Sequence, residues 1–445
     1  MPFSGTIALL LVSLPCFAGS LQLNGLALDP SLFRVTQFAQ VSGGPLAMVP
    51  FADGSLGLGS YTDGVLRFTD VNHDGFADGP GTSLYGSAGA HLGLLQAGGY
   101  LIDSNFGTYA SGATTPSITL LRSGSTPDVP PVPTGSLQFG FPADWEHNQP
   151  GIASRPTPGQ PGFYDLVFNV GSQYDHQLSA GKVQLSGLLN GTLDGDSLYA
   201  VTLDLRGSQP VASSLRKVAS GIRNVVGMGF QPGTGDFYFV DNAIDGPGAD
   251  GDEPPQADEI NRIAAADFDT GTPPDFGYPN CFVQYRTGVQ IGSGCVAPFF
   301  AIQPLPNGTL LGSESEGPAQ LDFAPANFPA GFNNGIFIGF SGKGFHTGTA
   351  NEENAVGYYD FQSGNYIHFS ENSQDGVYQP IGIRSTDSSL FIADFGAGVV
   401  YEVTSAAPEP SGAALMTAGF VLLLWGFRPL ALRRAKRNIP CTIRC

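Results

Sequence analysis

The stretch Gly233–Asn242, with the sequence GTGDFYFVDN, carries the pattern from which the architecture follows. It opens on a tight glycine turn, continues as a short aromatic and β-branched run, and ends on a carboxylate and an amide. Such runs favour a β-strand bounded by turns. Similar runs are LGLGSY from Leu56, YLIDSN from Tyr100, LVFNVGS from Leu166, IFIGFS from Ile336 and LFIADF from Leu390. Together they predict six repeats of a strand-based unit.

The composition agrees with a folded β-protein that has many turns. The 445 residues include 62 Gly and 35 Pro, and 42% are hydrophobic, which is too apolar for a disordered tail. Radial repetition around a centre protects the exposed edges of four-stranded sheets. We therefore predict an all-β, six-bladed β-propeller with long inter-strand insertions over residues 20–404. The strand Phe33–Phe38 is expected to pair with the last blade and close the ring. A large β-sandwich or jelly roll is the alternative.

The N-terminal end is typical of a signal peptide. Ile7–Leu14 is a short apolar core, and Cys16-Phe17-Ala18 has small residues at the two positions that a signal peptidase recognises. We therefore expect signal peptidase to remove residues 1–18 and the body of the protein to be exported.

The C-terminal end carries three successive features. Pro408-Glu409-Pro410 precedes an apolar run, Gly412–Phe427, which is followed by a basic cluster. A helix over this run is about 24 Å long, somewhat short of a bilayer core of about 30 Å, and the basic cluster favours the cytoplasmic side. This order resembles the PEP-CTERM sorting signal of Gram-negative bacteria, which implies cleavage by an exosortase near the motif.

The resemblance has consequences for location. It assigns residues 405–437 to the sorting segment, with a transmembrane helix, and residues 438–445 to a tail. The protein is then anchored in the inner membrane before processing and reaches the cell surface or extracellular matrix afterwards. An ordinary C-terminal membrane anchor is the alternative.

The charge of the chain limits its partners. The net charge is −19, and six of the 19 Lys and Arg residues lie after Phe427, where Asp and Glu are absent. The body is therefore strongly acidic and repels nucleic acid and anionic lipid, whereas divalent cations and neutral ligands are favoured. We expect no nucleic-acid partner.

Cys281 and Cys295 are the only two cysteines between the processed ends. In an oxidising compartment we expect them to form one disulfide. Two free buried thiols are the alternative.

The loop Asp70–Asp78, with the sequence DVNHDGFAD, places oxygen ligands at alternate positions. The predicted ligands are Asp70, Asn72, Asp74 and Asp78. Gly75 permits the turn that lets these oxygens converge, as in a calcium loop, although the bidentate glutamate of a complete EF-hand is missing. The pattern predicts a structural calcium, and a plain turn between blades is the alternative.

A further set of motifs lies between residues 221 and 280. The motifs are Gly221-Ile222-Arg223-Asn224, Asp241-Asn242 followed by Gly246-Pro247, Asp258-Glu259-Ile260-Asn261, and Asp275-Phe276-Gly277-Tyr278-Pro279. In this order they resemble the glucose/sorbosone dehydrogenase family, which includes soluble quinoprotein glucose dehydrogenases. The resemblance implies a six-bladed propeller that holds pyrroloquinoline quinone (PQQ) beside calcium and oxidises a sugar hydroxyl.

The resemblance also implies roles for single residues. His147, in Glu146-His147-Asn148, matches the base that takes the hydroxyl proton, a task that suits an imidazole. Arg223 matches the arginine that stabilises charge on the reduced quinone. Calcium would be held by the carbonyls of Gly246 and Pro247, with Asp258 and Glu259 nearby. Lys343 and Arg384 resemble partners of the cofactor carboxylates.

Each of these residues also has a purely structural interpretation. Arg223 can bridge loops through nearby carboxylates, and His147 can be an ordinary hydrogen-bonded loop histidine. Lys343 and Arg384 can be solvated side chains at a turn and at a strand end.

Three classes of function therefore stay open. The first is a quinone-dependent sugar oxidoreductase, and the second is a non-catalytic, calcium-stabilised propeller that binds polysaccharide or protein at the cell surface. The third, less favoured, is a calcium-dependent lactonase-like hydrolase. The first class is favoured if one concave pocket is shared by His147, Arg223, Lys343 and the Gly246-Pro247 carbonyls, and scatter of these groups favours the second.

Overall fold

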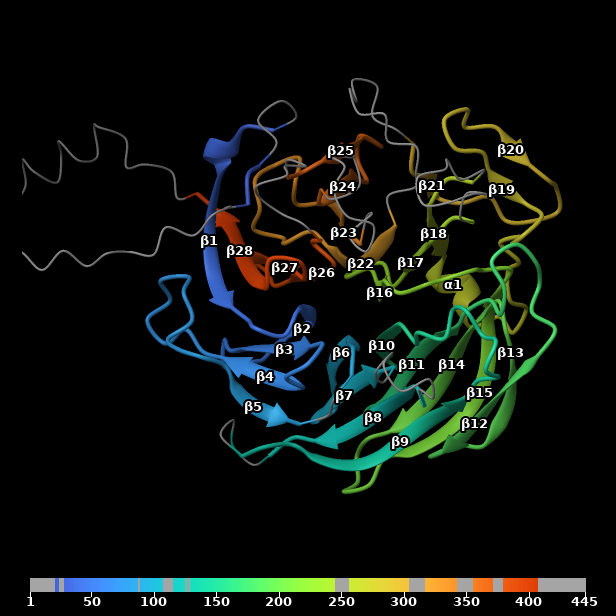
Figure 1. The fold of residues 1–445 in the computed structure, drawn as a ribbon, viewed down its shortest axis with the longest axis horizontal. Coiled ribbons are helices and arrows are strands. Elements are labelled where there is room, and N and C mark those ends of the chain that lie inside the picture. Colours follow the sequence, from blue (N-terminus) through green and yellow to red (C-terminus); the bar gives the residue numbers. More distant parts are fainter. Residues whose placement is uncertain are drawn as a thin grey trace, which may run out of the picture. The chain divides into compact units, whose positions relative to one another are not determined.

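The computed structural model describes residues 21–23, 28–86, 89–106, 115–124, 126, 129–244, 256–303, 317–341, 355–370 and 379–406. Within these residues, six antiparallel sheets surround a centre, which confirms the predicted all-β, six-bladed propeller (Figure 1). Its helical elements are one short helix, α1 (Ala265–Phe268), and one 3-10 turn, η1 (Pro30–Leu32). The chain divides into two units, residues 1–405 and 406–445, and all the sheets belong to the first.

The blades are numbered here in chain order. Blade 1 has β2 (Pro45–Pro50), β3 (Leu56–Ser60), β4 (Val65–Phe68) and β5 (Thr82–Tyr85). Blade 2 has β6 (His91–Ala97), β7 (Tyr100–Asn105), β8 (Ser117–Arg122), β9 (Val132–Gly140), β12 (Lys182–Gly187) and β13 (Gly191–Asp194). Blade 3 has β10 (Ile152–Pro156), β11 (Phe163–Val170), β14 (Ser197–Asp204) and β15 (Val211–Ser220).

Blade 4 has β16 (Met228–Phe230), β17 (Phe237–Asp241), β18 (Glu259–Ile263) and β21 (Phe300–Ala301). A separate hairpin, β19 (Phe282–Val283) and β20 (Gln290–Ile291), lies between β18 and β21 in the chain. Blade 5 has β22 (Pro318–Phe323), β23 (Gly335–Phe340), β24 (Gly357–Asp360) and β25 (Tyr366–His368). Blade 6 has β26 (Gly382–Ser385), β27 (Ser389–Asp394), β28 (Val399–Ser405) and β1 (Phe33–Gln40).

The six sequence runs are the second strands of the six blades. They are β3, β7, β11, β17, β23 and β27, and nearly every residue in them is buried. A second strand has a neighbour on each edge and a packed blade on each face. It therefore needs apolar residues on both faces, which explains why the sequence signal is a continuous apolar run and not an alternation.

The ring is closed by strands from the two ends of the body. β1 pairs antiparallel with β28, from Phe33 opposite Ser405 to Gln40 opposite Val399. This confirms the predicted role of the strand that begins at Phe33. The C-terminal part of the body supplies only three strands of blade 6, β26, β27 and β28. β1 covers the outer edge of β28 and is the fourth strand.

Polar residues at the ends of several second strands fix the entry to their own blades. Asn169 accepts a hydrogen bond from the Gly151 amide (2.6 Å), and Asp394 accepts one from the Gln379 amide (3.1 Å). Asp241 accepts from the amides of both Arg223 and Asn224. The carboxylates and amides that end the sequence runs therefore satisfy backbone donors that no strand partner reaches.

Two insertions depart from the four-stranded plan. The chain leaves blade 3 after β11 and forms the hairpin β12–β13, which pairs with β9 and so extends blade 2. The second insertion lies between β18 and β21 and carries the hairpin β19–β20. Both insertions lie beside blade 3, and both contribute to the sites described below.

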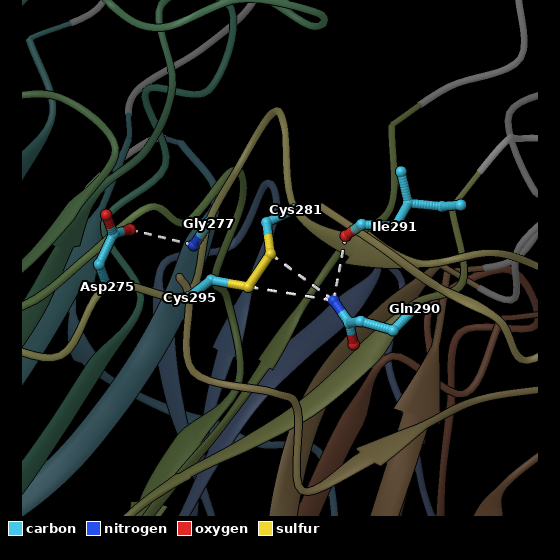
Figure 2. Close-up of a disulfide and its surroundings, with 6 residues drawn as sticks. All are labelled: Asp275, Gly277, Cys281, Gln290, Ile291 and Cys295. Atoms are coloured by element: carbon cyan, nitrogen blue, oxygen red, sulfur yellow. Dashed lines mark hydrogen bonds between the residues drawn. A yellow bond between two sulfur atoms is a disulfide. The ribbon is translucent and has the colours of Figure 1, made fainter. Parts of the chain in front are cut away.

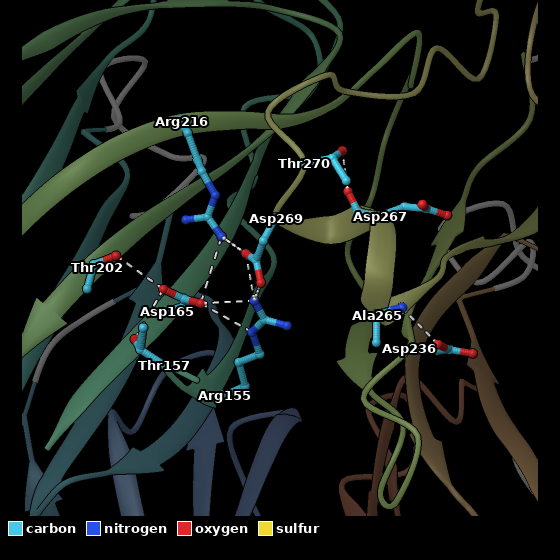
Figure 3. Close-up of polar contacts among 10 residues, drawn as sticks. All are labelled: Arg155, Thr157, Asp165, Thr202, Arg216, Asp236, Ala265, Asp267, Asp269 and Thr270. Carbon is cyan, nitrogen blue, oxygen red and sulfur yellow. Dashed lines mark hydrogen bonds and ion pairs between the residues drawn. The ribbon is translucent and has the colours of Figure 1, made fainter. Parts of the chain in front are cut away.

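An ionic cluster joins blade 3 to helix α1 (Figure 3). Arg155 contacts Asp165 on the neighbouring strand (3.1 Å) and Asp269 just after α1 (2.6 Å), and Arg216 also contacts Asp269 (2.7 Å). The guanidinium of Arg155 lies 4.4 Å from the Phe268 ring centroid. The shielded Arg155–Asp165 pair lies within blade 3, and the contacts of Arg155 and Arg216 with the half-exposed Asp269 join this blade to the segment after α1.

Side chains cross the centre of the ring. The innermost strands contact one another in the order β2, β6, β10, β16, β22, β26 and back to β2. The Gln320 amide donates to the Leu92 carbonyl (2.6 Å), and the Arg384 Nε donates to the Met48 carbonyl (2.9 Å). Hydrogen bonds therefore tie inner strands of different blades across the centre.

The predicted targeting segments lie outside the described residues. These are the signal peptide 1–18, Pro408-Glu409-Pro410, the apolar run that follows and the tail. Among the residues whose placement is described, no helix is both long enough and apolar enough to cross a bilayer.

Gly382 marks a point where two inner strands nearly touch. A Cβ at this position of β26 would lie 2.1 Å from the Leu46 carbonyl oxygen and 2.7 Å from the Ala393 Cβ. Backbone atoms on the neighbouring strand cannot yield as a flexible side chain does, so blade 1 and blade 6 can approach this closely only through glycine.

We predict that Gly382→Ala lowers the free energy of unfolding by about 2 kcal/mol or more, because the methyl group forces the two blades apart. The measurement is urea denaturation followed by circular dichroism. Gly79→Ala is the matched control, since a Cβ at Gly79 meets no atom within 4 Å. Equal stability of the two variants would contradict the tight packing of the ring.

Candidate active site

His147 and Arg223 lie on either side of the segment that follows β11. His147 precedes β10, and its amide donates to the Ser172 carbonyl (3.1 Å). Arg223 follows β15, and its carbonyl accepts from the Ser172 amide (2.8 Å). A Cβ on Gly171 would lie 2.7 Å from the His147 Cβ and 2.9 Å from the Arg223 carbonyl oxygen. The structure therefore brings together two of the predicted site residues, 76 positions apart in the sequence.

The hydrogen bonds of Ser172 fix the tautomer of His147. The Ser172 hydroxyl donates its hydrogen to the Tyr174 carbonyl (2.7 Å), so its Oγ accepts from His147 Nδ1 (2.7 Å). The Ser172 carbonyl, 3.1 Å from the same Nδ1, also only accepts. Nδ1 therefore carries the hydrogen, and Nε2 of the neutral ring is the nitrogen with a lone pair.

The surroundings keep the imidazole neutral. Burial, and then the nearby positive charge of Arg223, lower the pKa of His147 to about 3. Both effects disfavour the charged form, because a buried imidazolium loses hydration and is repelled by a guanidinium. The ring consequently stays neutral from pH 7 down to about pH 4.

Arg223 is itself held by a carboxylate. Its side chain is 4% exposed, and its Nε donates to Asp175 Oδ1 (2.7 Å), with Nη2 bonded to the same oxygen. Asp175 also pairs with His176 (2.6 Å). Arg223 thus bridges loops through a carboxylate, as its structural interpretation predicts. Asp175 partly compensates the guanidinium charge near His147.

Tyr278 supports this loop from the other side. Its hydroxyl donates to the Tyr174 carbonyl (2.6 Å), next to the Asp175 that holds Arg223. Tyr278 belongs to the insertion between β18 and β21, where a disulfide joins Cys281 to Cys295 (Figure 2). In the same insertion the Gly277 amide donates to Asp275 (3.0 Å). The expected pair of cysteines therefore braces the segment that positions Tyr278.

Three acidic residues, Asp241 at the end of β17 and Asp258 and Glu259 where β18 begins, are buried. Asp258 accepts from the amides of Ala243 (2.7 Å) and Gly317 (3.0 Å). Burial raises the pKa of Asp241 to about 6, and burial together with Asp241 raises that of Glu259 to about 8. In this part of the chain Glu259 Oε1 has no hydrogen-bond partner.

An unpartnered buried carboxylate oxygen fits a cation, but the other predicted ligands, Gly246 and Pro247, lie outside the described residues. The described residues contain no group of three His, Cys, Asp or Glu side chains that could hold a metal ion on its own. Calcium at this position stays a prediction.

The loop Asp70–Asp78 closes on itself through its oxygens. Asp70 accepts from the Asp74 and Gly75 amides, at 3.2 and 2.9 Å. Asp78 accepts from the Val71 amide (2.7 Å), and Asn72 donates to Asp74 (2.9 Å). The four predicted ligands are therefore gathered in one turn, and their hydrogen bonds within the loop are those that a plain turn would make. Calcium at this loop also stays a prediction.

Arg384 lies apart from His147. Besides Met48, it reaches the Leu94 carbonyl (3.4 Å) and Asp322 (3.5 Å) at the centre of the ring. These contacts join inner strands, and the side chain is 25% exposed, so it is not the solvated arginine of the structural interpretation. Its role toward a cofactor stays a prediction. Lys343 lies outside the described residues.

Sequence reasoning gave no role to Ser172, Asp175 or Tyr174, which organise the site. Their only signal was position, because Ser172 ends the run that begins at Leu166. A polar residue directly after a second strand lies where the loops of the ring converge.

Comparison with known proteins supports the fold. No protein-family model matches the sequence, and no curated protein does. The calcium structure of a Trichoderma reesei protein of Carbohydrate-Active Enzymes family AA12 is 15% identical, with a TM-score of 0.56 over 87% of this chain and 98% of that one. The holo form of the pyranose dehydrogenase PQQ domain from Coprinopsis cinerea is 14% identical, with a TM-score of 0.52 over 84% of this chain and 95% of that one.

A glucose dehydrogenase structure is also similar, at 13% identity and a TM-score of 0.50 over 84% of this chain and 100% of that one. At these identities the likeness establishes a shared propeller fold. It assigns neither cofactor nor substrate to this chain.

The neutral state of His147 makes stability depend on pH. Its folded-state pKa, about 3, lies below the ordinary value of 6.5, so between these values the unfolded chain binds a proton that the folded protein does not. Stability from this group is complete above pH 6.5 and is lost as the pH falls, by at most about 1.4 kcal/mol per pH unit.

We therefore expect His147→Gln to become more stable relative to the wild type as the pH falls from 7 to 5, by about 2 kcal/mol. Denaturation midpoints measured at several pH values test this. His73→Asn is the control, because His73 is exposed and has a φ of 54°, which asparagine accepts. A pH-independent difference between His147→Gln and the wild type would contradict the neutral, buried imidazole.

Proposed function

We propose that this protein is a carbohydrate oxidoreductase that oxidises a sugar hydroxyl at His147 with a bound quinone as the electron acceptor. The observation that carries the proposal is the tautomer of His147. An imidazole whose Nδ1–H is bonded to Ser172 keeps its lone pair on Nε2, and that is the atom that can accept the proton of an alcohol. The sequence motifs and the fold shared with the PQQ domain agree with it.

The chain's own residues account for the proton half of the reaction. The sugar hydroxyl lies against Nε2 and gives up its proton there as the carbon loses a hydride and the C–O bond becomes a carbonyl. Ser172 keeps the ring oriented throughout. Arg223 places positive charge beside the developing alkoxide, which lowers the cost of removing the proton.

The described residues fit PQQ in part. Arg223 supplies a cation next to the base, and the unpartnered Glu259 Oε1 fits the calcium that would accompany the cofactor. The cofactor carboxylates need a further cation, for which Lys343 is the predicted residue. When bound, PQQ supplies the two-electron acceptor.

A second candidate is the non-catalytic, calcium-stabilised propeller that binds polysaccharide or protein. The observation in its favour is that Arg223 and Arg384 are each already paired, with Asp175 and Asp322. A cofactor with several carboxylates would then have to compete with side chains of the protein itself. For the lactonase-like hydrolase, the described residues offer no specific support.

We test the two candidates by calorimetric titration of the full chain with PQQ in the presence of calcium. We expect saturable binding, followed by turnover of an aldose with an artificial electron acceptor. His147→Gln should lower turnover about 10²-fold or more while leaving PQQ affinity nearly unchanged, because it removes the base and not a cofactor contact. Arg206→Gln, a surface arginine paired with Asp204, is the control.

No binding at about 50 µM PQQ would exclude the oxidoreductase and leave the binding propeller. Binding without turnover of any aldose would show that the cofactor is retained and that the substrate is not a sugar of this kind.

We further propose that the protein is exported and sorted. Signal peptidase removes residues 1–18, the C-terminal helix holds the chain in the inner membrane, and an exosortase cuts near Pro408-Glu409-Pro410 before the protein reaches the cell surface or matrix. Mass spectrometry of the native protein should find an N-terminus after Ala18 and a C-terminus near residue 410. An intact C-terminal segment in the mature protein would favour the ordinary membrane anchor instead.

A further inference from the structure

A polar pocket lies at the end of blade 3 where β14 begins and β15 ends. It has a volume of about 510 Å³, within the range of pockets that bind small molecules. Three segments line it: the β12–β13 hairpin with Lys182 and Asp194, the ends of β14 and β15, and the disulfide loop that carries Tyr278 and Cys295. Residues from two insertions and one blade therefore meet in one concave site.

One rim of the pocket carries one carboxylate bonded to two ammonium groups. Asp194 is bonded to Lys182 and to Lys217, the latter at 2.7 Å, and these side chains are 46, 58 and 28% exposed. Each ammonium group keeps more donors than one carboxylate can use, and each carboxylate oxygen has more than one lone pair. The rim therefore offers donors and acceptors side by side, as vicinal hydroxyl groups require.

The back of the pocket is rigid and polar. Asp196 is 7% exposed, and its carboxylate accepts from the Ser179 amide (2.9 Å) and hydroxyl (2.8 Å). On the opposite wall the Cys281–Cys295 disulfide and the Gly277–Asp275 hydrogen bond fix the loop (Figure 2). Because both walls are braced before any ligand arrives, little ordering entropy is lost on binding.

The chemistry of the lining excludes several ligand classes. Three carboxylates, Asp194, Asp196 and Asp275, outnumber the two lysines, so anions are repelled. Leu178 is the only large aliphatic side chain in the lining, which disfavours an apolar ligand. Among the described residues no three acidic, histidine or cysteine side chains are placed to hold a metal ion, which disfavours a cation.

The pocket is distinct from the His147 site, although the two share a wall. Neither His147 nor Arg223 lines it. The Asp196 amide contacts the Gly171 carbonyl (3.4 Å), and Gly171 is packed against His147 on its other side. Tyr278 lines the pocket and also holds Tyr174, whose carbonyl accepts from Ser172. One layer of backbone therefore separates the two sites.

We propose that this pocket binds a neutral carbohydrate chain, through hydrogen bonds from Lys182, Lys217 and Asp194 to its hydroxyl groups. The proposal does not depend on oxidation at His147. It gives the protein a place to hold a glycan whether the neighbouring site is catalytic or not.

The test is calorimetric titration of the full chain with four trisaccharides: maltotriose, cellotriose, laminaritriose and the anionic trigalacturonic acid. We expect at least one of the three neutral sugars to bind with a dissociation constant between about 10 µM and 1 mM, and trigalacturonic acid not to bind. Lys217→Met should weaken binding about tenfold by removing a charged donor. Ser293→Trp, at an exposed position of the disulfide loop, should abolish binding by filling the pocket without altering the thermal midpoint.

Two further variants separate this site from its neighbour. Arg206→Gln, on blade 3 but outside the pocket, and His147→Gln should both bind the trisaccharide as the wild type does. The proposal is overturned if no neutral sugar binds at about 10 mM, if trigalacturonic acid is preferred, if binding survives Ser293→Trp, or if it is lost in His147→Gln. Failure of PQQ binding leaves this result unaffected, so the two proposals fail separately.

Discussion

The pairing of β1 with β28 is the contact on which the rest of the structure depends. Residues at the beginning and end of the body meet in one ladder, from Phe33 opposite Ser405 to Gln40 opposite Val399. Until these strands pair, blade 6 has an unprotected edge, and the inner strands β26 and β2 have no reason to approach as closely as Gly382 and Leu46 do. Closure therefore brings blade 1 against blade 6, at the entropic cost of joining distant segments.

Ring closure also places the polar ends of the second strands. Asp241, Asn169 and Asp394 each satisfy backbone amides where the chain enters a blade. The segment that leads into blade 4 is held in this way and carries Arg223. It lies close to His147, which is in the segment that leads into the neighbouring blade 3. The hydrogen bonds that build the candidate active site are thus structural ones. Because Ser172 binds Nδ1 of His147, they leave Nε2 of that ring unprotonated.

Electrostatics at this site follow from burial more than from the net charge of the chain. The body is acidic, yet the pKa of His147 is lowered, because burial and the charge of Arg223 outweigh the opposing effect of Asp175, which is bonded to that arginine. The same burial raises the pKa of Asp241 and Glu259. A buried imidazole with a lowered pKa and buried carboxyl groups with raised pKa values lie within one acidic protein, since each responds to its immediate surroundings.

The sequence by itself determined the six second strands, because a strand covered on both faces must be apolar throughout, and it indicated the closing strand and the pairing of the two internal cysteines. It also singled out His147 and Arg223 through their motifs. Only the tertiary structure decided that Ser172 fixes the tautomer of His147, that Asp175 pairs with Arg223, and that Arg384 pairs with Asp322 on the neighbouring inner strand. These contacts join residues on different blades or insertions, and their geometry is set by how the blades pack, which no local pattern of residues encodes. The same reason explains why the pocket on blade 3, whose walls come from three separate segments, has no signature in the sequence.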